Sequence, residues 1–211
     1  MKKKVKRSYD STRRREQAIE TRRLILHAAH DLFVGKGYGR TTIAEVAAAA
    51  GVAPETVYAA YRNKPTLLRQ VWYATLRGDE EDVRLVHRPE IRAVLAEPDL
   101  ATRLRTQAVV YLPVFRRMTP LLRALQGAAT SEPEAAAMLA EFDERRVDVA
   151  GHYARAAVAT GQLAVSEDVC RDVLAATLDG ALWHRLVEEG GWPEDRFAHL
   201  LGTLWVATLT R

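Results

Sequence analysis

The chain has 211 residues, of which 48% are hydrophobic and 27% charged, proportions that are ordinary for a folded globular protein. Its single cysteine, Cys170, excludes an intrachain disulfide and a zinc site built on paired thiolates, and this usage fits a reducing compartment. The basic first residues are followed by no apolar signal segment, and no stretch reaches the ~18 apolar residues that a membrane span requires. We therefore expect a cytoplasmic protein that has no membrane contact.

The formal net charge of +4 conceals two regions of opposite sign. Residues 1–77 contain 16 Lys and Arg against 6 Asp and Glu, a balance of +10, whereas residues 78–211 contain 15 against 21, a balance of −6. A segregation of this kind indicates that the N-terminal third binds a polyanion. The alternative is a solvated surface with a disordered basic tail, and the charge pattern alone does not decide between the two.

Four helices are predicted in the N-terminal third, because apolar residues recur there at spacings of three and four. The first runs from Glu16 to Lys36 and is stopped by glycines. A second, short helix begins behind Thr41-Thr42 and ends at Gly51. A third spans Pro54 to Tyr61, and a fourth, capped by Asn63, continues to about Arg77.

The remainder also lacks the period-two alternation of strands, so we predict an all-α fold with about nine to ten helices. Residues 78–88 lose periodicity and are interpreted as a connection. Pro113 should bend one of the later helices, another should start after Pro120, and Ser131 with Glu134 forms a capping-box pattern for a long helix. The predicted helices beyond the connection span residues 90–97, 99–118, 121–128, 131–160, 166–188 and 193–209.

The segment IAEVAAAAGVAPETVYAAYR, residues 43–62, fulfils the requirements of a helix-turn-helix. Two short helices can cross closely only where their facing side chains are small, which Ala47 and Ala50 provide. The turn needs a residue that tolerates positive φ, and Gly51 stands there. Val57 then supplies an apolar anchor six residues later. The remaining positions of the second helix should face the major groove, where a recognition helix reads base edges.

The longer run TRRLILHAAHDLFVGKGYGRTTIAEVAAAAGVAPETVYAAYRNKPTLL resembles the DNA-binding domain of the TetR/AcrR family of transcriptional regulators. The resemblance implies a basic, flexible arm (residues 1–15), a DNA-binding domain (16–77) and a helical regulatory and dimerisation domain (78–211). It further implies a homodimeric repressor that binds double-stranded operator DNA and has no enzymatic activity and no cofactor. The DNA-contacting residues that it implies are Thr41, Thr42, Ala53, Pro54, Glu55, Thr56, Tyr58 and Lys64.

Two positions depart from the family pattern or admit two interpretations. Many relatives carry a second aromatic or histidine shortly after the tyrosine of the recognition helix, whereas this chain has Ala59 and Ala60. Base reading should therefore depend on fewer side chains, and sequence-independent phosphate contacts should supply more of the affinity. Glu55 either accepts from a cytosine amino group or simply suits the positive end of its helix dipole; the second interpretation is favoured.

The resemblance also places two further sites in the C-terminal region. The last two helices should form the dimer interface, although their apolar stripes could equally face their own core. The middle helices should enclose a pocket for a small apolar or aromatic ligand of unknown identity, although such aromatics are more often plain core. The residues predicted for the dimer interface are Val173, Leu174, Leu178, Leu182, Phe197, Leu201, Leu204 and Trp205. Those predicted for the ligand pocket are Tyr111, Phe115, Met118, Met138, Phe142, Tyr153 and Trp183.

Two functional hypotheses remain from the sequence. The first is a repressor that a small molecule releases from DNA, and the second is a DNA-binding regulator whose C-terminal domain serves only dimerisation or protein contacts. A closed cavity of a few hundred Å³ among the middle helices would favour the first. In the cluster of His27, His30 and Asp31, the two histidines share a helix face, but no third ligand group is evident, so we expect no metal site.

Overall fold

The computed structural model describes residues 5–78 and 87–211, with side chains from residue 13 onward, and the predicted connection at residues 78–88 lies largely outside these ranges. The described residues form helices, and one isolated β-bridge joins Leu163 to Thr210. No described helix is both long and apolar enough to cross a bilayer. The elements are α1 (Val5–Lys36), α2 (Ile43–Ala49), α3 (Pro54–Tyr61), α4 (Lys64–Arg77), α5 (Pro89–Ala96), α6 (Leu100–Val110), α7 (Leu112–Ala129), α8 (Pro133–Val158), α9 (Glu167–Thr177), α10 (Ala181–Trp183), a π-helical segment (His184–Glu189) and α11 (Glu194–Leu209).

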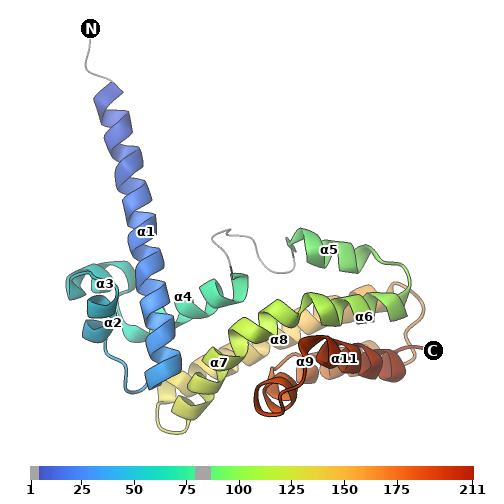
Figure 1. Ribbon diagram of the computed structural model, residues 1–211. Coiled ribbons are helices and arrows are strands. Elements are labelled where there is room, and N and C mark those ends of the chain that lie inside the picture. Colours follow the sequence, from blue (N-terminus) through green and yellow to red (C-terminus); the bar gives the residue numbers. More distant parts are fainter. Residues whose placement is uncertain (1–4, 79–86) are drawn as a thin grey trace.

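The helices form two groups that α4 connects (Figure 1). At one end, α2 and α3 pack beside α1, whose N-terminal half extends well beyond them. At the other end, α6 packs along α11 and α8 along α9. The pair α7 and α8 runs from this second group back to the base of α1, so the body of the molecule reaches the small N-terminal group directly.

The helix break near Pro113 occurs earlier than the sequence predicted. The predicted helix over residues 99–118 is divided at Tyr111, and Pro113 lies in the first turn of α7, where its missing N–H costs no hydrogen bond. The prediction of a new helix after Pro120 was wrong, because α7 continues through this residue to Ala129. Phe115 and Leu121, on either side of the proline, are both buried, and burial of this continuous apolar face outweighs the lost hydrogen bond.

Two further boundaries differ from the prediction. Ser131 does not cap α8: its hydroxyl donates to the carbonyl of Ala128 at the end of α7, and Glu132 is the residue that precedes α8. The predicted helix over residues 166–188 is interrupted at Gly180, which has a φ of +82°. Glycine adopts this backbone conformation without a steric penalty, and it redirects the chain between α9 and α10.

The hydrophobic core of the N-terminal group is shared with the body. Phe33, Val57 and Leu67 are fully buried at its centre, and the same cluster includes Leu121 of α7 and Phe142 of α8. A second cluster lies among α6, α8, α9 and α11 and contains Trp183 and Trp205. The boundary near residue 78 therefore separates two sequence regions but cuts through one packed core.

Candidate functional site

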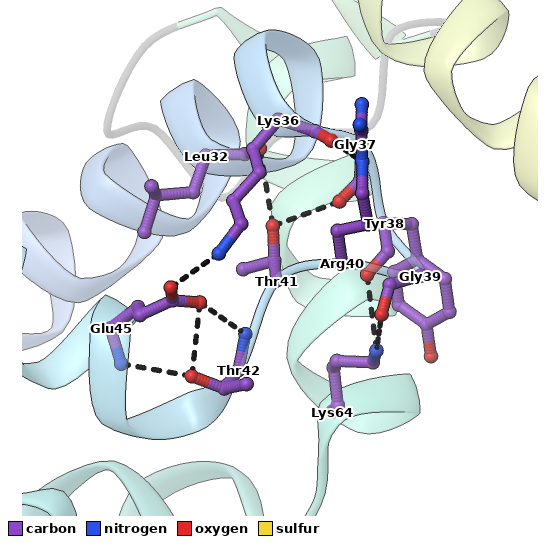
Figure 2. A network of polar contacts seen from close by, with 10 residues as sticks. All are labelled: Leu32, Lys36, Gly37, Tyr38, Gly39, Arg40, Thr41, Thr42, Glu45 and Lys64. Carbon is purple, nitrogen blue, oxygen red and sulfur yellow. Dashed lines mark hydrogen bonds and ion pairs between the residues drawn. The ribbon is translucent and has the colours of Figure 1, made fainter.

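The first turn of α2 is fixed by a capping box (Figure 2). The Thr42 hydroxyl accepts from the backbone N–H of Glu45 at 3.2 Å, and the Thr42 N–H donates to the Glu45 carboxylate at 2.9 Å. Lys36, at the end of α1, donates to the same carboxylate. The hydrogen bond from Lys36, followed by those from Thr42, lowers the pKa of Glu45 to about 2. Thr42 is exposed, but its hydroxyl is committed to this cap.

The turn between α2 and α3 has the geometry of a helix-turn-helix. Gly51 has a φ of +68°, and the N–H of Val52 donates to the Ala47 carbonyl at 3.0 Å, which closes the turn. Val57 of α3 is fully buried against this turn, as its spacing predicted, and Tyr61 is also buried. The rest of α3 and its N-cap faces solvent, namely Ala53, Pro54, Glu55, Thr56, Tyr58, Ala59 and Ala60.

Besides Thr42, two other predicted DNA contacts are engaged within the chain itself. Thr41 is buried, and its hydroxyl donates to the carbonyls of Leu32 and Gly37 at 3.2 and 2.9 Å, so the structure assigns it to the α1–α2 connection and not to a groove-facing surface. The Lys64 ammonium donates to the carbonyls of Tyr38 and Gly39 at 3.0 and 3.3 Å. Figure 2 shows both tethers.

Lys64 also lies 4.3 Å from the centre of the Tyr38 ring, a cation–π distance. Tyr38 is itself buried, and burial, followed by the charges of Glu134 and Glu132, raises the pKa of its hydroxyl to about 12. An ammonium has three N–H groups, and two of those of Lys64 are used in holding this loop. Its first role is structural, and at most one N–H remains for a phosphate.

Sequence reasoning missed Arg62, which follows the last residue of the recognition helix. Its φ and ψ are 63° and −50°, and it is the only non-glycine residue with positive φ among the described residues. The Asn63 N–H donates to the Tyr61 carbonyl at 2.6 Å, so Arg62 occupies the centre of a strained γ-turn. Its side chain is exposed and has no hydrogen-bond or ion-pair partner among the described residues. Nothing in the sequence of residues 62–64, RNK, predicted this backbone strain.

The N-terminal half of α1 presents a second basic surface. The helix begins at Val5, eleven residues before the predicted Glu16, so part of the predicted flexible arm is helical. Residues 13–20 are all exposed, and they include three consecutive arginines, Arg13 to Arg15. This half of α1 extends past α2 and α3 without contacting the body (Figure 1).

Several contacts join α4 to the body. The indole of Trp72 stacks on Phe142 of α8, with 3.9 Å between ring centres and 7° between planes. Arg69 forms an ion pair with Glu141 of α8 at 2.7 Å. Finally, α4 ends at Gly78, which has a φ of +75°, and at this end a side chain from α7 takes part in capping the helix.

That side chain is Arg117, whose guanidinium donates to the carbonyls of Thr75 and Leu76 at 3.1 and 3.2 Å. These carbonyls belong to the last turn of α4, where no N–H of the helix is available to them. A Cβ at Gly78 would lie 2.4 Å from the Arg117 guanidinium carbon. Arg117 of the body thus supplies hydrogen bonds to two carbonyls in the last turn of α4.

A cavity of about 640 Å³ lies behind these contacts, between α4, α7 and α8. Of the predicted pocket residues, Tyr111, Phe115, Met118 and Phe142 line it. Trp72 and Tyr73 of α4 also line it, although they were not among the predicted pocket residues. The other lining residues are Leu76, Arg77, Val114, Thr119, Leu122, Asp143, Arg145, Arg146, Asp148, Val149, Leu178, Asp179 and Gly180.

Three of the predicted pocket residues do not line the cavity. Met138 belongs to the shared N-terminal core. Tyr153 lies behind the wall and accepts a hydrogen bond from the Tyr111 hydroxyl at 2.9 Å. Trp183 stacks on Phe115, with 5.8 Å between the ring centres. Helical spacing placed these side chains inside the body correctly but did not distinguish a wall from the layer behind it.

The residues predicted for the dimer interface divide into two sets. Leu174, Phe197, Leu201 and Trp205 are buried within the chain, where α9 and α11 pack on α8 and α6. These four residues therefore belong to the chain's own core, and their assignment to the dimer interface was wrong. Leu204 is 42% exposed, and the partly exposed remainder comprises Val173, Leu178 and Leu182.

The histidines of α1 interact with an acidic neighbour. His27 Nε2 and His30 Nδ1 lie 3.5 and 3.1 Å from the carboxylate of Asp31. Within the described ranges no group of three or more metal-binding side chains comes together here or elsewhere.

Residues 25–71 match the family model of the bacterial regulatory proteins, tetR family. No curated protein sequence matches the chain significantly. Among solved structures, the SmeT–triclosan complex is 21% identical and superposes with a TM-score of 0.66 over 90% of this chain and 92% of SmeT. NalD of Pseudomonas aeruginosa, the secondary repressor of the MexAB-OprM multidrug efflux pump, is 22% identical with a TM-score of 0.62 over 92% and 98%.

A transcriptional regulator from Saccharomonospora viridis in complex with choline is 18% identical, with a TM-score of 0.67 over 91% of this chain and 98% of that one. These structures share the fold across nearly the whole chain. The matched segment contains the helix-turn-helix whose turn, anchor and exposed face are described above. Residues 25–71 are therefore similar to the bacterial regulatory proteins of the tetR family, and the chain as a whole shares the fold of the solved structures named above.

Proposed function

We propose that this protein is a homodimeric repressor that a small apolar or aromatic molecule releases from its operator. The observation that carries the proposal is the 640 Å³ cavity whose wall includes Trp72 and Tyr73 of α4. Its volume lies in the range of small-molecule sites. Only Arg62 and Asn63 separate α3 from α4. The helix that lines the cavity is therefore directly connected to the helix-turn-helix formed by α2 and α3, called the reading head below.

Operator reading is assigned to the exposed side of α3. Thr56 and Tyr58 face solvent there and would enter the major groove, with Ala53, Pro54 and Glu55 near base edges or the backbone. Phosphate contacts are assigned to Arg62 and to Arg13–Arg15. Arginine suits this role because its planar guanidinium matches the geometry of a phosphate group.

Release is assigned to a movement of α4. Trp72 and Phe142 are in direct contact across the cavity wall, so a ligand that enters between them has to separate α4 from α8. The two recognition helices of a dimer must match half-sites roughly 34–36 Å apart, and a shift of α4 would change that spacing. A tenfold loss of DNA affinity requires only about 1.4 kcal/mol of difference between the two states.

The dimer is assigned to the exposed side of α9 and α11 around Val173 and Leu204. A lone recognition helix of eight residues reads few bases, so two copies are needed for selective binding. Relatives of this fold have been solved with triclosan and with choline, which is consistent with a ligand-responsive member.

The test begins with selection of genomic fragments that the purified protein retains, followed by fluorescence anisotropy on the recovered sequence. Thr56→Ala with Tyr58→Ala should abolish discrimination between this operator and random DNA while leaving the fold unchanged, because both side chains are exposed. Small molecules that raise the melting temperature are then added to the complex. Stabilising molecules that never release DNA would favour the alternative, a regulator whose C-terminal region serves only dimerisation or protein contacts.

A further inference from the structure

Three buried polar atoms belong to side chains that line the cavity and have no hydrogen-bond partner among the described residues. They are the hydroxyl of Tyr73 on α4, the hydroxyl of Thr119 on α7 and Nε of Arg146 on α8. Thr119 is the most enclosed of the three, with only 1% of its surface exposed. Buried polar groups in folded proteins nearly always have partners, so three orphans around one cavity indicate that the cavity's occupant supplies them.

The chemistry of these atoms defines the partner. An arginine Nε–H can only donate, and a threonine or tyrosine hydroxyl has one hydrogen to donate. All three groups are therefore satisfied by an acceptor. A hydroxyl or carbonyl oxygen on the ligand meets this requirement, whereas a hydrocarbon leaves the donors unpaired.

The wall of the cavity selects an uncharged, aromatic body. Four aromatic residues line it, Trp72, Tyr111, Phe115 and Phe142, and the last three are buried. Rings prefer stacked or edge-on neighbours, which an aromatic ligand supplies and an aliphatic chain does not.

The charged lining residues do not favour an ion. Arg77, Arg145 and Arg146 are balanced by Asp143, Asp148 and Asp179. Arg146 already pairs with Asp143 at 2.9 Å, and Arg145 pairs with Glu141. An ionised ligand would lose its hydration among the buried rings without meeting a net opposite charge.

We infer that the ligand is an uncharged, planar aromatic molecule that carries hydroxyl or carbonyl oxygen, and that such oxygen accepts from Thr119 and from the two other unpaired donors of the lining, Tyr73 and Arg146. The inference rests on the proposed ligand site and adds the chemical class of the ligand. The inference makes Thr119 a residue that determines specificity through its hydroxyl, because valine would pack in the same way without that hydroxyl.

The experiment compares three probes by equilibrium dialysis: 2-naphthol, naphthalene and 2-naphthoate. Wild type should bind 2-naphthol about tenfold more tightly than naphthalene. The naphthoate anion should bind more weakly than 2-naphthol. Thr119→Val should weaken 2-naphthol about fivefold and leave naphthalene unchanged, because it removes one hydroxyl and keeps the volume. Tyr73→Phe should have the same selective effect.

The control is Thr106→Val, whose hydroxyl lies on α6 outside the cavity and donates to the Thr102 carbonyl. It should change the affinity for no probe. Because the Thr119 hydroxyl has no partner, Thr119→Val should also keep the melting temperature of the parent. The inference is overturned if Thr119→Val weakens both neutral probes equally or neither, if naphthoate binds most tightly, or if no probe binds at its solubility limit.

Operator anisotropy in the same samples separates this inference from the proposed function. If 2-naphthol binds with the expected dependence on Thr119 but DNA stays bound at saturation, the ligand class holds and ligand-induced release fails. If charged or aliphatic molecules release DNA through the same cavity, release holds and the ligand class fails.

Discussion

The indole of Trp72 lies flat on the ring of Phe142, 3.9 Å from centre to centre and 7° from parallel. One ring belongs to the helix that follows the helix-turn-helix and the other to the body, so their contact is one of those that join the two regions. A stacked aromatic pair contributes roughly 0.5–1.5 kcal/mol beyond the area that it buries. This contact is large enough to couple the regions and weak enough for a ligand to break.

The first prediction concerns this pair. Phe142→Leu and Trp72→Leu should each lower the free energy of unfolding, and the double mutant should lose about 1 kcal/mol less than the sum, because the stacking is lost only once. Urea unfolding of the four proteins measures this coupling. Additive losses would show that the rings only fill space and do not join α4 to α8.

The second prediction concerns the cap on α4. Arg117→Gln should cost about 1–3 kcal/mol, because it removes two charge-assisted hydrogen bonds to the Thr75 and Leu76 carbonyls. Hydrogen exchange should rise selectively in the last turn of α4. The neighbouring Arg116→Gln is the matched control: Arg116 is exposed and pairs with Glu194, so its loss should leave stability and exchange in α4 unchanged. Equal effects of the two variants would contradict the assignment of Arg117 as the cap.

The third prediction uses a series at Arg62. Arg62→Gly should raise the free energy of unfolding by about 1 kcal/mol, because glycine adopts positive φ without strain. Arg62→Gln keeps the strain, and Arg62→Lys keeps the charge. If Arg62 contacts a phosphate, the glycine and glutamine variants should bind operator more weakly and lose about 0.9 from the slope of log affinity against log salt, while lysine retains the slope. An unchanged slope in all three variants would place Arg62 away from DNA.

The fourth prediction follows from the depressed pKa of Glu45. Its folded-state pKa of about 2 lies below the ordinary value of 4.5, so its carboxylate stabilises the fold above pH 4.5 and this contribution is lost as the pH falls toward 2. Glu45→Gln should therefore be less stable than the parent at pH 7, and the gap should narrow at pH 3 and close only as the pH approaches 2. Unfolding midpoints in urea at both values test this, and a gap of unchanged size at pH 3 would mean that the carboxylate charge is not its source.

The fifth prediction concerns the proposed dimer. Leu204→Glu should yield a folded monomer with weak operator binding, because Leu204 is exposed on α11. Val109→Glu, at an exposed site on α6, should stay dimeric. Light scattering gives the mass, and circular dichroism checks the helix content. Charge at the buried Leu201 would instead unfold the protein and reveal nothing about the interface.

Short-range signals made much of the fold and the reading head predictable. Asn63 caps α4 through a hydrogen bond of 2.8 Å to the Thr66 N–H, and Gly51 adopts the left-handed turn that its position requires. Such features depend on a few adjacent residues. Pro120 illustrates the opposite case, because burial of an apolar face over the whole of α7 outweighed a local helix breaker.

The unpredicted parts of the site depend on contacts that are distant in the sequence. Lys64 is held by backbone carbonyls that are 25 and 26 residues away in the sequence. Its position in the family pattern predicted a contact with a DNA phosphate and gave no sign of these partners within the chain. Tyr153 and Phe115 have the same kind of helical spacing, yet only Phe115 reaches the cavity. No sequence pattern distinguishes these two residues, because the difference arises from how α7 and α8 are oriented against each other.

The core that α1 and α4 share with Leu121 and Phe142 bears on how the protein denatures. A fragment that ended at residue 78 would lack these side chains and the guanidinium that closes α4, so the reading head cannot keep its native stability when cut free. Calorimetry of the full chain should then give one transition, with a calorimetric enthalpy equal to the van't Hoff value. Operator DNA and the ligand, each added alone, would raise the temperature of that single transition, since each acts on the same cooperative unit.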